Sequence, residues 1–344
     1  METPGLFLMR GIGSLPFGRK KPPVSIEITI CHGCRRESET GDTIKMGIAI
    51  QARALIVATL LGATLVPFPV RAASEPVVLE PTMAWNVDWA ANYCTLQRTF
   101  GTEEAPLLLR INSYQPGYTF EFFIAGEQTR PLGKRGSLAM TLGDHGPFDI
   151  EHPKLADSEN FGPGFIFSKN IHEADPSAGD ELRGEQDQPM PVADPAFDAG
   201  LRSITLSSDG HSLELRTGPL AAALKAMRSC VDNMVASWGL DPAVQAGVTR
   251  MARARDTGKL AKRIQAFYPQ AQARKGENGW LSLLAMIDAT GKPTSCKIQL
   301  TYADSAFNDQ PCKVVMDSHF EPALDARGQP VASFWRTTIN YLLS

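Results

Sequence analysis

The sequence has 344 residues, of which 43% are hydrophobic and 21% charged, and its formal net charge at pH 7 is −3. This length is enough for two ordinary domains, at roughly 100 to 200 residues per domain, and the composition is that of a folded globular protein. A nucleic-acid-binding protein carries a clustered basic face. The small negative charge therefore argues against nucleic acid as a partner.

An apolar run near the start of the chain predicts export. Residues 54–65 read ALIVATLLGATL, Arg53 precedes them, and the small residues Ala72 and Ala73 follow. A basic lead, an apolar core and an exit of small residues describe a secretory signal peptide. The uncharged stretch is also close to the shortest length that spans a bilayer. A retained single-span anchor and a buried core helix are therefore the alternatives to a cleaved signal.

Met46 stands where the first residue of such a signal would be. We therefore interpret residues 1–45 as a non-native or disordered lead and residues 46–73 as the signal peptide or membrane anchor. A cleaved signal predicts a protein of the periplasm. An uncleaved one predicts a protein that is anchored in the inner membrane and faces the periplasm.

Four cysteines lie beyond this segment, namely Cys94, Cys230, Cys296 and Cys312. An even number in an exported chain predicts two disulfides, and four cysteines allow three connectivities. Proximity along the sequence favours a bond between Cys296 and Cys312, which leaves Cys94 with Cys230.

Residues 74–240 are expected to form a β-rich domain closed by a helix. Two hairpins are predicted, with turns at residues 115–117 (Gln-Pro-Gly) and 209–210 (Asp-Gly), and the Asp-Gly pair is a strong short-range hairpin signal. Apolar residues recur at helical spacing between residues 218 and 239, where a proline suits the first turn and a glycine the end of a helix. The expected strands cover residues 107–113, 118–124, 165–167, 203–206 and 212–215.

Residues 172–199 within this domain carry eight acidic side chains against one basic, and four prolines. A segment with so few large apolar side chains cannot bury enough surface to offset the entropy of ordering it. We expect a flexible acidic loop. The carboxylates lack the glycine-punctuated spacing of a calcium loop, so no metal is expected there.

Residues 241–260 are predicted to form a helical linker that is rich in arginine. Its apolar residues are too sparse for a membrane-binding face. The tripeptide Asp256-Thr257-Gly258 matches the catalytic turn of aspartic proteases, but such a site needs a second copy to supply paired carboxylates, and the sequence beyond residue 73 has none. We therefore expect Asp256 or Thr257 to be a helix N-cap.

Other catalytic and cofactor-binding patterns are missing from the sequence. It lacks the G-x-S-x-G elbow, the H-E-x-x-H metal helix, the phosphate-binding P-loop and the dinucleotide-binding G-x-G-x-x-G. Cys31 and Cys34 have no second Cys or His pair at zinc-ligand spacing downstream. We therefore predict that the protein is not an enzyme and holds no metal and no cofactor.

Residues 261–344 are predicted to form a small α/β domain, which makes the whole chain α+β. A helical pattern over 259–267 is followed by an apolar run of strand length over 280–287 and by alternating apolar and polar residues over 294–300. A second helix is expected over 307–318. A final strand with one buried face ends the order helix, strand, strand, helix, strand; its residues of buried parity are Val331, Trp335, Ile339, Tyr341 and Leu343.

This segment resembles the C-terminal domain of the TonB family. The family pattern runs from Tyr-Pro through a spaced alanine and G-x-x-G into a strand, an acidic-to-glycine turn, a second strand, a helix, and then R-F-x-P-A and G-x-P-V before the last strand. His319 stands in the place of the arginine of R-F-x-P-A, and Cys296 and Cys312 are similar to a variant of the family with a bridging disulfide. The matching residues are Tyr268-Pro269, Ala273, Gly276, Gly279, the turn 288–291, Phe320-Glu321-Pro322-Ala323 and Gly328-Gln329-Pro330-Val331.

The resemblance implies a binding module in which an extended peptide hydrogen-bonds to the outer edge of the terminal strand. In the family that peptide belongs to an outer-membrane TonB-dependent receptor, and binding supports energy-dependent transmembrane transport. The alternative is a soluble periplasmic interaction or scaffold protein with no transduction role, since no long proline-rich spacer precedes the domain. The candidate partner-binding residues are Tyr268, Pro269, Phe334, Arg336, Thr338 and Asn340. They also have a structural interpretation, in which they fix the backbone of the fold.

Overall fold

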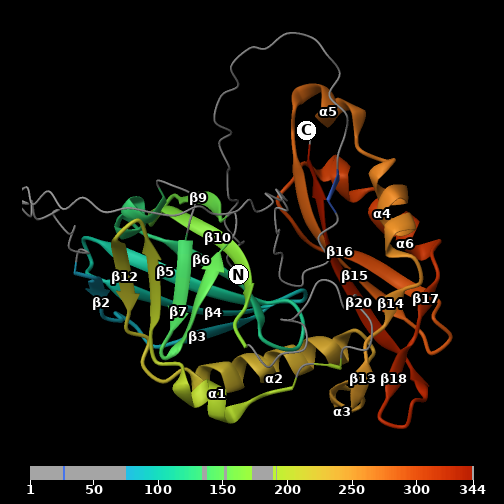
Figure 1. The fold of residues 1–344 in the computed structure, drawn as a ribbon, viewed down its shortest axis with the longest axis horizontal. Coiled ribbons are helices and arrows are strands. Elements are labelled where there is room, and N and C mark those ends of the chain that lie inside the picture. The colour runs from blue at the N-terminus through green and yellow to red at the C-terminus, as the bar shows by residue number, and fades with distance from the viewer. Residues whose placement is uncertain are drawn as a thin grey trace, which may run out of the picture.

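The computed structural model describes residues 26–27, 75–133, 138–150, 153–172, 189–190 and 192–342. The predicted signal segment 46–73 and most of the predicted acidic loop lie outside these residues. The fold is α+β, as predicted, and most of its buried apolar side chains gather in two large clusters. We call the residues around the first cluster the N-terminal domain and those around the second the C-terminal domain (Figure 1).

Two sheets share the core of the N-terminal domain. The larger has the strand order β3-β4-β5-β6-β10-β9, and the smaller has the order β2-β12-β11-β7-β8. The strands of the larger sheet are β3 (Asn86–Trp89), β4 (Cys94–Gly101), β5 (Pro106–Ser113), β6 (Thr119–Ala125), β9 (Lys154–Ser158) and β10 (Gly162–Asn170). Those of the smaller sheet are β2 (Val77–Leu79), β7 (Leu138–Leu142), β8 (His145–Ile150), β11 (Ile204–Ser208) and β12 (His211–Leu215), and the 3-10 helix η1 (Glu127–Gly133) joins β6 to β7.

The structure confirms both predicted hairpins. The turn from β5 to β6 contains Gly117, whose φ is 108°, and the turn from β11 to β12 places Asp209 and Gly210 at φ of 48° and 81°. Glycine and aspartate enter this left-handed region at lower cost than other residues. Two successive residues with positive φ match the right-handed twist of the flanking strands.

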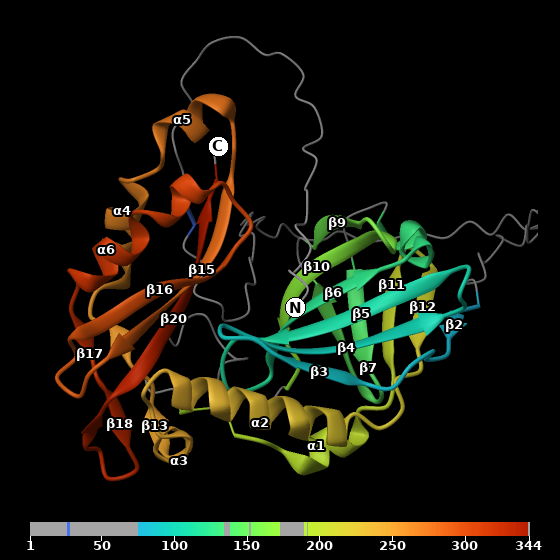
Figure 2. The ribbon, with the colours of Figure 1, turned by 180° about the vertical axis from the view of Figure 1, so that it is seen from behind.

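A long helix closes the N-terminal domain, as predicted. α2 (Ala221–Ser237) ends before Gly239, which has a φ of 81°. Its buried residues lie in the first core, and the short helix α1 (Pro195–Gly200) packs beside it (Figure 2). The prediction of a flexible loop over 172–199 is therefore wrong at its C-terminal end. Asp194 starts α1 there, because its carboxylate accepts hydrogen bonds from the first amides of the helix.

The prediction of a helical linker over 241–260 is also wrong. The segment forms the short helix α3 (Pro242–Ala246), then β13 (Val248–Arg250) and β14 (Arg253–Ala254) before the next helix begins. β13 pairs with β18 (Ala323–Asp325) and β14 with β17 (Phe320–Glu321). These partners come about seventy residues later in the chain, and they pull the segment into the C-terminal domain.

The C-terminal domain is a sheet of strand order β1-β20-β15-β16 with helices against it (Figure 1). β15 (Gly279–Ile287) is central and pairs antiparallel with β16 (Pro293–Thr301) and β20 (Ser333–Tyr341), while β1 (Ile26–Glu27) lies on the outer side of β20. The remaining elements are α4 (Thr257–Gln265), α5 (Gln270–Lys275), the 3-10 helix η4 (Ser305–Asn308), α6 (Pro311–Met316) and β19 (Pro330–Val331).

The predicted second helix of this domain is divided in two. Residues 307–318 were expected as one helix, whereas η4 ends at Asn308 and α6 begins at Pro311. Proline has no N–H to continue a preceding helix but suits the first position of a new one. The order helix, strand, strand, helix, strand is otherwise the observed one.

Candidate functional site

The candidate binding strand β20 is buried on the face that the sequence assigned to the core. Trp335, Ile339 and Tyr341 are each at most 5% exposed. The Trp335 ring meets that of Phe320 with centroids 5.0 Å apart, and the Tyr341 ring meets that of Phe307 at the same distance. These contacts hold β20 against β17 and against the 3-10 helix η4.

The opposite face of β20 is buried too, which corrects the prediction of one buried face. Phe334 is 1% exposed and Thr338 is 2% exposed, and Arg336 and Asn340 are half-buried. Phe334 packs edge-on against Trp238, which follows α2, with the ring centroids 5.2 Å apart. Phe334 therefore lies at the junction between the two domains, and none of these four side chains is fully exposed.

A polar network joins this face of the sheet to the N-terminal domain. The Arg336 Nε donates to Gln299 Oε1 at 2.9 Å, and the Arg336 guanidinium lies 5.1 Å from the centre of the Tyr114 ring. Gln299 in turn donates from Nε2 to the backbone oxygens of Asn92 and Tyr114, at 2.9 and 2.8 Å. Because buried polar groups are costly unless hydrogen-bonded, this network favours one relative placement of the two domains.

Glu121 lies at the centre of the junction and is only 2% exposed. Its Oε1 accepts hydrogen bonds from Asn112 Nδ2 at 3.0 Å, Tyr114 OH at 2.9 Å and Tyr302 OH at 3.2 Å. Tyr302 belongs to the C-terminal domain and the others to the N-terminal one. Burial raises the pKa of the Glu121 carboxyl, and the hydrogen bonds and the charge of Arg336 partly oppose that rise.

The outer side of β20 receives a second strand. β1 pairs with it antiparallel, Ile26 lying opposite Tyr341 and Glu27 opposite Asn340. On the inner side β15 pairs with β20 at nine positions, from Gly279 opposite Tyr341 to Ile287 opposite Ser333. β20 therefore has a neighbouring strand on both sides at Asn340 and Tyr341, which corrects the expectation that its outer edge is open to an added strand along its whole length.

The other two candidate residues, Tyr268 and Pro269, have structural contacts. The Tyr268 hydroxyl donates to the backbone oxygen of Glu277, and its ring packs edge-on against Phe307 and Tyr341 with centroids 5.4 and 5.5 Å apart. Burial raises the pKa of Tyr268. Pro269 is the N-cap residue of α5. Both residues therefore orient the chain between α4 and β15, next to the end of β20 that β1 contacts.

Two motif glycines are required by close packing. A Cβ on Gly279 would lie 2.9 Å from the ring of Phe307, and a Cβ on Gly291 would lie 2.2 Å from the backbone oxygen of Phe320. Gly291 also has a φ of 83°, as the predicted turn after β15 requires. These motif positions fix the fold of the sheet.

The structure confirms both predicted disulfides. Cys94 on β4 is bonded to Cys230 on α2, with their Cα atoms 6.0 Å apart. Cys296 on β16 is bonded to Cys312 on α6, with their Cα atoms 5.4 Å apart. Each bond ties a helix to the sheet beneath it.

The aspartate of the Asp-Thr-Gly tripeptide is a helix cap, as expected. Asp256 precedes α4, and its Oδ1 accepts a hydrogen bond from the Lys259 amide at 2.7 Å. A buried ion pair in the N-terminal domain was not predicted. The buried Asp198 carboxylate accepts from Tyr118 OH at 2.9 Å and from Arg228 Nη2 at 2.8 Å.

Sequence reasoning also missed Glu121. A signal for it is present, because β6 reads TFEFFIA and this glutamate is the one charged residue in an apolar strand. An isolated charge at such a position is buried with partners or marks a function.

Comparison with known proteins confirms the resemblance drawn from the motifs. Residues 264–343 match the family model for the Gram-negative bacterial TonB protein C-terminal domain. No curated protein and no solved structure matched the chain. The C-terminal domain is thus similar to that of the envelope-associated TonB proteins, and the match does not extend into the N-terminal domain.

Across the parts of the chain that the structure describes, no helix is both long enough and apolar enough to cross a membrane.

Proposed function

We propose that the protein is a periplasmic TonB-like module that binds an outer-membrane receptor, or another periplasmic protein, by strand addition to the outer side of β20. The observation that carries this proposal is the antiparallel pairing of β1 with Asn340 and Tyr341. An extended segment therefore fits that side of the strand. A TonB-type C-terminal domain is an interaction domain rather than a catalyst, which agrees with the lack of catalytic motifs in the sequence.

The packing of β20 prepares it for this role. Its nine pairs with β15 and its buried side chains on both faces hold the backbone in one extended conformation. A guest strand would then meet an edge that is already ordered. The entropic cost of pairing would therefore fall mainly on the guest strand. Main-chain hydrogen bonds would provide affinity with little dependence on the guest's sequence.

Backbone methylation of the guest tests the proposal directly. Extended peptides derived from outer-membrane receptors would be titrated into the protein in two N-methylated forms, one methylated on alternate residues and one on the intervening residues. Alternate N–H groups of a strand point to opposite sides. One form should therefore lose binding while the other keeps it. Equal affinities for the two forms would show that no strand is added.

The second arm of this experiment uses β1 as an internal competitor. A chain that starts at residue 75 lacks Ile26 and Glu27, which occupy the positions opposite Tyr341 and Asn340. It should bind the unmethylated peptide more tightly than the 344-residue chain does. Weaker binding by the shorter chain would place the peptide elsewhere on the molecule.

The alternative function is that of a soluble periplasmic scaffold with no transduction role. The observation in its favour is the polar junction around Glu121 and Gln299, which holds the C-terminal domain against the N-terminal one. Cell fractionation and a pull-down with outer-membrane proteins separate the two functions. A protein that stays with the inner membrane and retains a receptor supports energy-dependent transport, whereas a soluble protein that retains another periplasmic partner supports the scaffold.

A further inference from the structure

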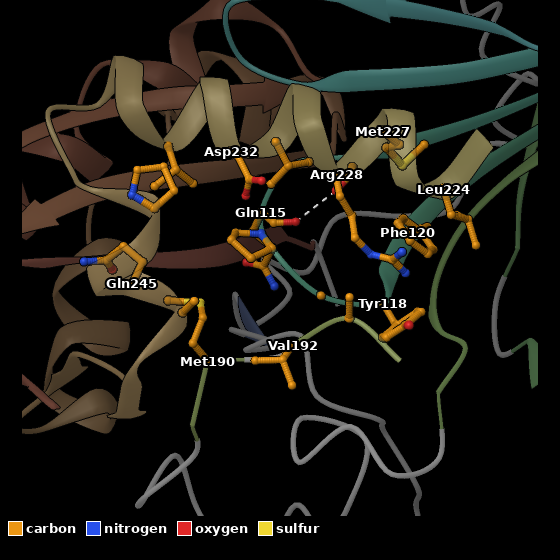
Figure 3. A pocket seen from close by; sticks show the side chains of 18 residues that line it. Gln115, Tyr118, Phe120, Met190, Val192, Leu224, Met227, Arg228, Asp232 and Gln245 are labelled. Carbon is orange, nitrogen blue, oxygen red and sulfur yellow. Dashed lines mark hydrogen bonds between the residues drawn. The ribbon is translucent and has the colours of Figure 1, made fainter. Parts of the chain in front are cut away.

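A cavity of about 210 Å³ lies where α2 approaches α3. In Figure 3, Leu224, Met227, Arg228 and Asp232 extend from α2 on one side, and Met190 and Val192 lie across from them. The loop between β5 and β6 forms a further wall. The cavity is larger than an engineered apolar cavity of about 150 Å³ that binds benzene, so it has room for a short aliphatic or aromatic group.

The lining is mainly apolar, and two of its polar side chains are already bonded within the protein. Gln245 is 2% exposed; it donates from Nε2 to the Ala332 oxygen at 2.9 Å and accepts from Ser333 Oγ at 2.7 Å. Arg228 is paired with the buried Asp198, which neutralises its charge. Gln245 is therefore committed to contacts within the protein, and the Arg228–Asp198 pair adds no net charge beside the cavity. The flexible methionines Met190 and Met227 can adapt to ligands of different shape.

Asp232 is the lining carboxylate that remains available. It lies one turn of α2 beyond Arg228, it is exposed, and within the described residues it forms no hydrogen bond or ion pair. A carboxylate beside an apolar cavity attracts a ligand that carries a positive charge next to its apolar part. The charge of the lining thus favours cations over anions.

We propose that this cavity binds a small cationic amphiphile, with its apolar group between α2 and Met190 and its ammonium group at Asp232. Such a group could belong to a free amine or to a basic residue that flanks an apolar one in a peptide. Both present an ammonium group beside an aliphatic group. A short peptide with lysine next to leucine distinguishes a peptide ligand from a free amine.

The test compares three six-carbon probes, hexylamine, hexanol and hexanoate, titrated into the full chain labelled with ¹³C at the methionine methyl groups. Binding should shift the Met190 and Met227 resonances. Hexylamine should bind about two- to fivefold more tightly than hexanol, which is the effect of one solvent-exposed ion pair, and hexanoate most weakly. Failure of all three probes to shift either resonance, or equal or tighter binding of hexanoate, would overturn the proposal.

Three variants assign the effect to the cavity. Asp232→Asn should abolish the preference for the amine and leave hexanol binding unchanged. Asp209→Asn, in the β11–β12 turn, is the matched control and should behave as the wild type. Ala246→Trp places a bulky ring at the lining position of α3 and should weaken all three probes. An unchanged amine preference in Asp232→Asn contradicts the assigned charge contact, and unchanged affinities in Ala246→Trp contradict the assigned cavity.

Discussion

Burial of Glu121 at the junction between the domains should make stability depend on pH, and Glu121→Gln should remove that dependence. A glutamate in an unfolded chain has a pKa of about 4.3, and burial raises the pKa of Glu121 in the folded protein. The folded state therefore binds this proton more tightly than the unfolded state does. The free energy of unfolding must then fall as pH rises through the window between the two pKa values.

The size of the effect follows from the same linkage. Each unit by which the folded pKa exceeds the unfolded one changes the stability by about 1.4 kcal/mol across the window. The slope cannot exceed about 1.4 kcal/mol per pH unit, the value for one full proton. Glutamine keeps an oxygen for the donors from Asn112, Tyr114 and Tyr302 but does not titrate.

The assay is urea unfolding of the oxidised full chain, followed by tryptophan fluorescence at a series of pH values from roughly 4 to 8. The informative quantity is the difference between the wild type and Glu121→Gln, because other carboxylates such as Asp288 have lowered pKa values and oppose the trend. Glu159→Gln, which changes an exposed glutamate of the same domain, is the control and should run parallel to the wild type.

Two outcomes would refute this reasoning. In the first, the free energy of unfolding of Glu121→Gln changes with pH in parallel with that of the wild type. In the second, the wild type gains stability relative to the variant as pH rises. Tyr302→Phe provides a check from the opposite domain, since it removes the hydroxyl that reaches Glu121. It should lower stability by about 1.5–3 kcal/mol where the carboxylate is charged.

The remaining predictions concern covalent and local constraints. In the chain-entropy model, the loss of stability on removing a disulfide grows with the length of the loop that it closes. Replacing Cys296 and Cys312, which are 16 positions apart, by alanine should lower the free energy of unfolding by about 3 kcal/mol. Replacing Cys94 and Cys230, which are 136 positions apart, should lower it by about 5 kcal/mol. Urea midpoints measure the two losses, and a larger loss for the short loop would contradict the model. Asp256→Ala removes the cap of α4 and should lower stability by about 1 kcal/mol. Because Asp256 is not part of β20, peptide binding should be unaffected, and a titration checks this.

The features that the sequence predicted well are those set by short stretches of chain. The Asp209-Gly210 pair specifies its own turn, since few other residues adopt two successive positive φ angles. The Cys296–Cys312 bond joins residues that are close in sequence, and it left one remaining pairing for the other two cysteines. The turn follows from the chemistry of two adjacent residues, and the disulfide pairing follows from the number and spacing of the cysteines.

The features that the sequence missed depend on distant partners. Residues 248–254 form strands because residues 320–325 return beside them, and without that partner their pattern suggests a helix. Arg336 and Thr338 alternate with apolar residues and so suggest a solvent-facing side, but the N-terminal domain covers that side. The alternation of polar and apolar residues within one strand carries no information about a second domain that covers it.

Under the proposed strand addition, the burial of both faces of β20 restricts how a partner is selected. A peptide that pairs with its outer side cannot insert side chains between Phe334 and Trp238, which are already in contact, or beneath Tyr341, which Tyr268 and Phe307 cover. Selectivity must then come from groups that flank the strand at its two ends. Substituting Tyr268 should consequently alter the position of Tyr341 and the affinity for all added strands together, whereas a change of preference among peptides requires substitutions outside β20.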